Sequence, residues 1–396
     1  MAGKHDLARP HGYGVRIVEH PTSEPPTRPR RGTAVALGIL VLLALALVVA
    51  AFVQVDEYAI TPGYSQPVGP LIKVIDHPHD ATRRNILLTD VYLSRLSALQ
   101  WLWDTIHPVH VQLIPGSELS GPDVPTSELQ AQGYLEMYDS QNYAKVAGMR
   151  ALHLDVRGSH AGATVTAVTT AASGTLNVAD RIVGARGHAV TDVCSLVIAL
   201  HGAVPGTSVT LKVQRATISQ SGSISYATAT TISVPTAAVP RGDTQSGCPG
   251  AKPRTVWLGI SLEDAIQWAF PVSVTINTAN IGGPSAGLAM TLGVIDALSN
   301  GSLTGHVRIA ATGTIDPSGN VGDVGGVAEK TIAVETAGAT VFLVPPQELG
   351  VAQAAASGGL KVIAVATLDQ ALAAIKRAGG TTPVPITGPV TTGATS

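Results

Sequence analysis

The stretch "NIGGPSAGLAM", residues 280–290, places Ser285 in a glycine-rich frame ahead of an apolar run. The spacing of the apolar residues predicts a helix over about residues 284–299, opened by the serine. A serine at such a place can cap the helix, form part of a turn, or act as a nucleophile. Gly282 and Gly283 favour a nucleophile, because they let a substrate backbone approach closely.

The frame of residues 283–287 also fits the G-x-S-x-G elbow of serine hydrolases, which needs a later acid and then a later histidine. His306 is the only later histidine, and Asp296 is the only acid between it and Ser285. Asp296 falls on the helix that begins at the serine, so little chain remains for separate triad loops. We therefore disfavour a Ser–His–Asp triad here, although triads occur in other chain orders.

A lysine is the remaining base for Ser285, provided that burial lowers its pKa toward neutral. Lys330 shares one face of an expected helix with Val327 and Val334, whereas Glu329 lies off that face. A lysine at the edge of an apolar face usually extends its amine to solvent, so periodicity alone leaves this alternative open. The other two lysines that follow the serine are Lys361, at the start of a strand, and Lys376, near a helix end.

Three stretches together resemble the proteolytic domain of Lon proteases, over about residues 257–380. The resemblance implies that Ser285 is the nucleophile and that Lys330 is its general base. It also implies that Thr312 supports the lysine through a hydrogen bond. The three stretches are "GGPSAGLAM" (282–290), "ATGTIDPSGNVGDVGGVAEKTIAVETAG" (311–338) and "ATVFLVP" (339–345).

Two positions depart from the family pattern. Gly282 stands where many members carry Asp, and Thr314 stands where Glu is frequent. Neither departure removes the serine or the lysine. Long Lon enzymes also carry an ATPase, but the chain has no G-x-x-x-x-G-K-[ST] motif. An ATP-independent enzyme is therefore expected.

Residues 145–235 contain short strands of period two and one clear helix. Within them, "TLNVADRIVGARGHAVTDVCSLVIALHGAVPGTSVTLKVQR" (175–215) resembles the PDZ family, with Ala179 where glycine usually precedes Asp180. The resemblance implies a domain that adds a peptide strand to a sheet edge and holds its terminal carboxylate. A small sheet domain used only as a spacer is the alternative.

Residues 32–54 hold no charged side chain and exceed the roughly 20 apolar residues that cross a bilayer. Three arginines precede this run, and Asp56 and Glu57 follow it. The positive-inside rule then predicts a single-pass cell-membrane protein with a disordered cytoplasmic tail, residues 1–31. A cleaved signal peptide is the alternative, but its apolar core spans only about 7–15 residues. The arginines are Arg28, Arg30 and Arg31.

The formal net charge of -2 gives no footprint for nucleic-acid binding. The twelve histidines do not fall in zinc-binding spacings, so we expect no metal and no cofactor. Cys194 and Cys248 lie far apart, and both a disulfide and two separate thiols remain open.

The expected fold is α+β and multi-domain: an N-terminal transmembrane helix, a PDZ-like β-rich domain and a Lon-type proteolytic α/β domain. "SLEDAIQWAF", residues 261–270, is expected to be a short helix. The expected regions are a tail at 1–31, a signal anchor at 32–54, an extracytoplasmic connecting segment at 55–144, the PDZ domain at 145–235, the proteolytic domain at 250–380 and a disordered tail at 381–396.

These features predict a membrane-anchored, ATP-independent serine endopeptidase whose site lies outside the cytoplasm. Its partners would be unfolded or flexible proteins and peptides, and rings of copies are possible by analogy with Lon-type domains. The competing hypothesis is a non-catalytic, membrane-anchored PDZ scaffold with a Lon-like fold. The pair Ser285 and Lys330 separates the two hypotheses, since a scaffold does not need it.

Overall fold

The computed structural model describes residues 31–75, 85–120, 126–169, 172, 174–219, 223–241, 247–279, 281–299 and 303–384. The expected disordered tails fall almost wholly outside these ranges. Contacts divide the chain into two compact units, one ending at Phe52 and the other beginning at Val53.

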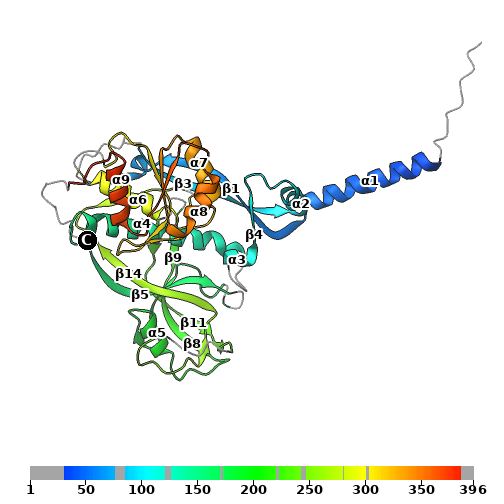
Figure 1. The fold of residues 1–396 in the computed structure, drawn as a ribbon. Helices are drawn as coiled ribbons and strands as arrows, with labels where there is room; N and C mark the ends of the chain where they lie inside the picture. The colour runs from blue at the N-terminus through cyan, green and yellow to red at the C-terminus, as the bar shows by residue number, and fades with distance from the viewer. Residues whose placement is uncertain are drawn as a thin grey trace, which may run out of the picture. The chain divides into compact units, whose positions relative to one another are not determined.

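A six-stranded mixed sheet forms the larger core of the second unit (Figure 1). β1 pairs antiparallel with β3 and β4, whereas β16 runs parallel to β3 and β19, and β19 runs parallel to β20. The sheet thus combines three strands from the early chain, β1, β3 and β4, with three from the late chain, β16, β19 and β20. In sheet order the strands are β20 (Lys361–Ala364), β19 (Val341–Val344), β16 (Ile309–Ala311), β3 (Ile86–Ser97), β1 (Gln54–Pro67) and β4 (Gln112–Pro115).

Helices cover both faces of this sheet. Alternate strand residues point to opposite sides, so Ile309 packs into one apolar cluster and Ala310 into another. The first cluster includes α4 (Thr126–Ala151), α6 (Gly287–Ala297) and α9 (Leu368–Arg377). The second includes α7 (Val327–Thr336) and α8 (Leu349–Ala355). We call this sheet, with the helices on its two faces, the three-layer body. The expected connecting segment supplies β1, β3 and β4 and so belongs to this body.

A second six-stranded sheet has the order β11–β8–β6–β5–β14, with β7 on β6. Residues 261–270, expected to be a helix, lie almost entirely in β14, which pairs antiparallel with β5 along nearly its whole length. This pairing overrides the local helical spacing. The strands are β5 (Arg157–Val168), β6 (Arg181–Ala185), β7 (His188–Ala189), β8 (Ser208–Gln214), β11 (Thr230–Pro235) and β14 (Ile260–Ala269).

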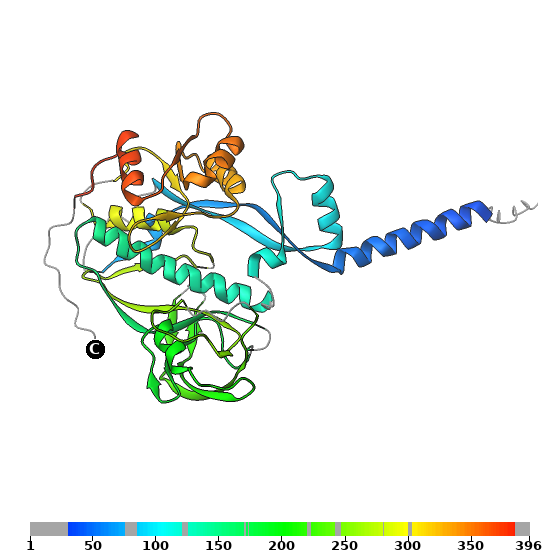
Figure 2. The same ribbon diagram turned by 60° about the horizontal axis from the view of Figure 1, so that its bottom comes forward.

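We call this second sheet, its core and helix α5 (Val193–Ala199) the sheet module. The expected proteolytic domain, residues 250–380, would include β14. In the structure, β14 pairs with β5 and so belongs to the sheet module. The long helix α4 runs between the module and the three-layer body (Figure 2). Leu135 packs into the core of the module, and Met137 packs into the core of the body. α4 is thus shared by both.

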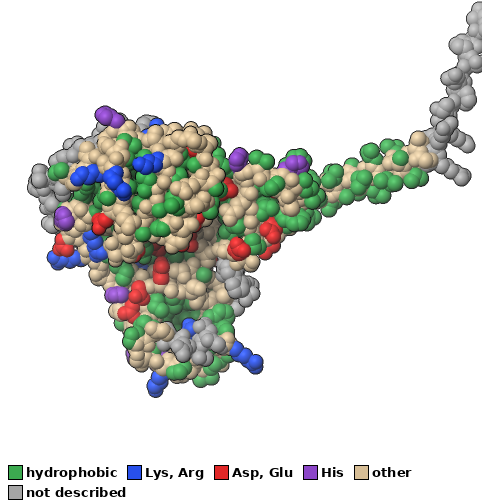
Figure 3. All heavy atoms as spheres, viewed as in Figure 1, with side chains coloured by type: hydrophobic (Ala, Val, Ile, Leu, Met, Phe, Trp, Pro, Cys, Tyr) green, Lys and Arg blue, Asp and Glu red, His purple; other side chains and the backbone are tan. Residues whose placement is uncertain are grey.

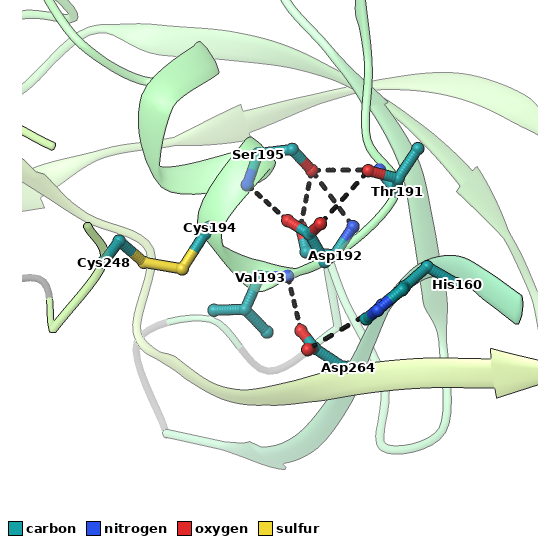
Figure 4. The surroundings of a disulfide bond; sticks show 8 residues. All are labelled: His160, Thr191, Asp192, Val193, Cys194, Ser195, Cys248 and Asp264. Atoms are coloured by element: carbon teal, nitrogen blue, oxygen red, sulfur yellow. Dashed lines mark hydrogen bonds and ion pairs between the residues drawn. A yellow bond between two sulfur atoms is a disulfide. The ribbon is translucent and has the colours of Figure 1, made fainter. Parts of the chain in front are cut away.

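A disulfide joins Cys194 of α5 to Cys248 (Figure 4). It settles the open question about the two cysteines, whose Cα atoms lie 5.4 Å apart. The Asp192 carboxylate caps α5 by accepting from the Ser195 N–H. The Ser195 hydroxyl oxygen in turn accepts from the Asp192 N–H. The disulfide therefore ties a capped helix to the linker that precedes β14.

The apolar helix α1 (Arg31–Phe52) makes up the described part of the first unit. Apolar side chains lie along the face of α1 seen in Figure 3, and none of the span Gly32–Phe52 is buried. By length and composition, these 21 residues could cross a membrane. A signal sequence meets the same criterion, so the helix is weak evidence for an anchor.

The remaining elements are short. They connect the larger ones or form two-stranded pairs within the second unit. They are η1 (Gly69–Leu71), β2 (Ile72–Val74) with β15 (Val274–Ile276), α2 (Ala98–Ile106), α3 (Gly116–Ser120), β9 (Ala216–Ile218) with β10 (Ile224–Tyr226), β12 (Ala237–Ala238) with β13 (Val256–Trp257), β17 (Thr314–Ile315) with β18 (Val321–Gly322), and η2 (Pro346–Glu348).

Candidate active site

Ser285 lies in a turn just before α6, and its side chain is half-buried. The helix begins at Gly287, three residues later than the expected start at 284, and Ala286 occupies the N-cap position. Ser285 is therefore not the N-cap residue, and α6 has no side-chain cap hydrogen bond. The cap interpretation therefore does not account for this serine, and its hydroxyl is left for another role.

Two donors from the segment after β16 hold the backbone of the serine. The Gly313 N–H donates to the Ser285 carbonyl at 2.9 Å, and the Thr312 hydroxyl donates to the same oxygen at 3.2 Å. Thr312 is fully buried. The resemblance implied a bond from Thr312 to Lys330, but in the structure the Thr312 hydroxyl donates to the Ser285 carbonyl.

Helix α4 holds the other side of the same turn. The Ser140 hydroxyl donates to the Pro284 carbonyl at 3.1 Å, and the Gly283 N–H donates to the Gly133 carbonyl at 2.8 Å. Sequence reasoning missed α4 as part of the site. The partners lie far apart in the chain, and the local signal was weak: Gly133 is one of two glycines inside α4.

The structure requires glycine at Gly283 and Gly287 but not at Gly282. Gly283 adopts φ +83°, a left-handed conformation that favours glycine. A Cβ on Gly287 would lie 2.8 Å from the Ile315 backbone nitrogen, so α6 packs too closely on β17 for a side chain. A Cβ on Gly282 would reach only ordinary contact with Gly133, at 3.4 Å.

Lys330 is buried on α7, with only 2% of its surface exposed. Gly326 begins the helix in a left-handed conformation, and its carbonyl accepts from the Lys330 N–H at 2.9 Å. Burial disfavours the ammonium and lowers the lysine pKa to about 8, against the opposing attraction of Glu348 and other nearby acids. The inward orientation expected from helical spacing is therefore correct. Glu329 was expected to lie off the inner face of the helix. This expectation is wrong, because Glu329 is also buried.

Ser285 and Lys330 line the same cavity of about 650 Å³. Gly282 and Gly283 line it as well. The structure records no hydrogen bond between the two described side chains, as catalytic contacts are often loose without substrate. Apolar and aromatic side chains from β1, β3, α3 and α4 form the far wall, among them Tyr58, Ile60, Val91, Leu119 and Leu129.

The cavity also offers a free donor for a developing negative charge. Within the part of the chain that the structure describes, the backbone N–H of Ser285 has no recorded acceptor. The start of α6 lies directly beyond it, where helix N–H groups and the dipole favour an anion. This arrangement has the chemistry of an oxyanion hole.

The other candidate bases do not approach the serine. Lys361, Lys376 and His306 are exposed, and none of them lines the cavity. Asp296, near the end of α6, accepts from the Leu303 N–H and does not line the cavity. The remaining candidate is a lysine on α4: burial lowers the pKa of Lys145 to about 8, but its amine lies over the Phe270 ring and outside the cavity.

A second cavity, of about 640 Å³, adjoins the first at Gln132 and Glu136, which line both. Asp139 of α4 and Glu263 of β14 line it together. Burial and the neighbouring Glu263 raise the pKa of Asp139 to about 8, and the two carboxyls share a hydrogen bond. The pKa of Glu263 is raised as well, chiefly by burial. This cavity therefore lies between α4 and the sheet module.

Comparison with known families supports a protease domain in the late chain. Residues 272–376 match the Lon protease (S16) C-terminal proteolytic domain, and both Ser285 and Lys330 fall inside the match. The match supports a serine peptidase. It covers the late part of the body, from β15 to α9, and does not include β1, β3, β4, α4 or β14.

Two curated relatives are Lon proteases. One, from Lachnoclostridium phytofermentans, is 33% identical over 93 residues, which is 23% of this chain and 11% of that protein. The other, from Clostridioides difficile, is 48% identical over 65 residues, which is 16% of this chain and 8% of that protein. The matched region thus spans about a tenth of each relative.

Proposed function

We propose that the chain is an ATP-independent serine endopeptidase that uses Ser285 as nucleophile and Lys330 as general base. The observation that carries this proposal is the shared cavity, in which a half-buried serine and a buried lysine of lowered pKa are the reactive groups. A lysine with a pKa near neutral can accept a hydroxyl proton, whereas an ordinary surface lysine cannot.

The reaction has two halves. Neutral Lys330 takes the hydroxyl proton as Ser285 Oγ bonds to the scissile carbonyl carbon, and the carbonyl oxygen becomes an anion bound by the Ser285 N–H. The anion collapses, and the leaving amine takes the proton from Lys330. Water then loses a proton to Lys330 and attacks the acyl group, and Ser285 Oγ leaves with that proton.

The chain would work at a membrane surface on the extracytoplasmic side. Support comes from the candidate span in α1 and from the arginines that precede it. No nucleotide-binding loop occurs in the sequence. Without an unfoldase, its substrates would be unfolded or flexible polypeptides.

The sheet module would dock a polypeptide end in the manner of a PDZ domain. β14 is an edge strand, so its free backbone groups can pair with an added strand. Helix α5 lies beside it, since the Val193 N–H donates to Asp264 of β14 at 2.8 Å. Gly259, with φ +72°, turns the chain into β14. Peptides with a free terminal carboxylate should bind the chain, and their amidated forms should not.

The catalytic proposal is tested by cleavage of casein by the full chain in detergent. Ser285→Ala and Lys330→Ala should each abolish cleavage, while the exposed control Lys361→Ala should cleave like the wild type. Equal cleavage by all four proteins would favour the scaffold hypothesis and end the protease proposal.

A further inference from the structure

Helix α2 and the loop after it carry an unusual surface. Five large apolar side chains there are between 39% and 69% exposed, and no residue of α2 is buried. Contiguous apolar surface of this kind marks an interaction site. We call it the α2 patch, and it consists of Trp101, Leu102, Trp103, Ile106 and Val109.

The α2 patch is locally ordered, although nothing in the described chain covers it. Ser97 and Gln100 form a reciprocal capping box at the start of the helix. The Thr105 hydroxyl donates to the Trp101 carbonyl at 2.7 Å, and the Trp103 ring stacks on His107 with 4.4 Å between centroids. The exposed side chains therefore belong to a formed helix rather than to a frayed end.

Chain connectivity places the α2 patch beside the end of the candidate span. The Ala98 N–H donates to the Val53 carbonyl at 2.8 Å, and Gln54 pairs with Ser97. Val53 directly follows Phe52, where α1 ends, and adjacent Cα atoms are about 3.8 Å apart. The first turn of α2 is thus hydrogen-bonded to Val53, the residue that directly follows the span. This holds for any orientation of the two units.

The chemistry of the α2 patch suits lipid better than a charged partner. Tryptophan prefers the boundary between headgroups and acyl chains, where its ring is buried and its N–H stays wet. No lysine or arginine occurs between Arg95 and Lys145, so attraction to anionic groups plays little part. In Figure 3 the surface at the position of α2 is green, tan and purple, and no blue is seen there.

We propose that the α2 patch inserts into the headgroup–acyl boundary of the membrane that α1 spans. The proposal rests on the membrane anchoring proposed above. A second contact of this kind would fix the body against the membrane surface. Tyr58 of the active-site cavity is five residues beyond Val53 on β1, which is roughly 17 Å along the strand.

The test uses the full chain in phosphatidylcholine vesicles with and without lipid brominated near the headgroup. Two of the four tryptophans belong to the α2 patch, so brominated lipid should quench about half of the tryptophan emission. The quenching should disappear in Trp101→Phe/Trp103→Phe and persist in the matched control Trp257→Phe/Trp268→Phe. Added phosphatidylglycerol should not change it.

Alkaline carbonate extraction separates the two proposals. If the wild-type chain is released, the membrane anchor itself is wrong. If the chain stays in the membrane but brominated lipid quenches it no more than the Trp101→Phe/Trp103→Phe variant, the anchor stands and the lipid contact is wrong. Quenching lost only at high chain-to-lipid ratio would assign the α2 patch to a second copy and would also overturn the proposal.

Discussion

The two adjoining cavities each contain an ionisable group with a pKa of about 8, reached from opposite directions. Burial lowers the pKa of Lys330 from 10.5, and burial with a neighbouring carboxyl raises that of Asp139 from 3.8. In both cases desolvation penalises the charged form. The difference lies in the charged neighbours: acids such as Glu348 and Asp90 partly offset the burial of Lys330, whereas Glu263 adds to the burial of Asp139.

The difference assigns separate tasks to the two groups. Lys330 loses its proton above about pH 8 and can then act as a base. Asp139 keeps its proton below about pH 8 and can then share it with Glu263, which holds α4 against β14. We infer that the cavity of Ser285 and Lys330 would perform the proposed chemistry, and that the other cavity fastens the sheet module to α4, which holds the turn at Ser285.

The largest effect is expected from Lys330→Met, which removes the base and keeps the apolar volume. Cleavage should fall by about 100- to 10,000-fold. At pH 7 the variant should be more stable to unfolding by up to about 3 kcal/mol, because a buried ammonium no longer has to form. Casein cleavage and urea unfolding at pH 7 measure the two effects.

A matched control is Lys361→Met, at an exposed position. It should change neither cleavage nor the free energy of unfolding. A Lys330→Met variant that is inactive and also much less stable would contradict the account, since the lysine would then serve the fold.

The next effect is a pH dependence of stability. The folded pKa of Asp139 lies above the unfolded one, so its contribution is lost as pH rises from about 4 to about 8, by up to roughly 1.4 kcal/mol for each pH unit. The folded pKa of Lys330 lies below the unfolded one, so stability recovers between about pH 8 and 10.5. Together they predict a minimum near pH 8.

Two variants separate the contributions of Asp139 and Lys330 to this stability minimum. Asp139→Asn should flatten the fall below pH 8, and Lys330→Met should flatten the recovery above it, both measured by urea unfolding across pH 5–10. A wild-type stability that stays level over this range would contradict both assigned pKa values.

The smallest effect concerns the turn between the cavities. Gly283→Ala should cost about 1–2 kcal/mol of stability, because alanine is strained at φ +83°. Gly282→Ala should cost less, since its Cβ meets only ordinary contacts. Thermal unfolding of the two variants compares them, and equal melting temperatures would contradict the geometry of the turn.

Local spacing predicted that Lys330 lies on an inner helical face, whereas the proposed roles of Ser285 and Lys330 came from the family resemblance. The helix around Lys330 was predictable because its spacing is local, and Val327 and Val334 are indeed buried with it. Glu329 was not predictable, because α7 packs on β1 and β3 as well as on α8 and buries more than one face.

The strand β14 and the part played by α4 could not be predicted, because both depend on long-range contacts. Leu262, Ile266 and Ala269 have helical spacing, yet pairing with β5 makes the segment a strand. The part played by α4 depends on contacts such as Ser140 to Pro284, which lie 144 residues apart in the chain. No local propensity encodes such a partner.

The most direct test of the Ser–Lys account is the pH dependence of kcat/KM for a soluble peptide, in the wild type and in Asp139→Asn. Activity should rise about tenfold for each pH unit and level off above a pKa of about 8, in both proteins alike. A flat profile between pH 6 and 10, or an inflection that disappears in Asp139→Asn, would contradict Lys330 as the base.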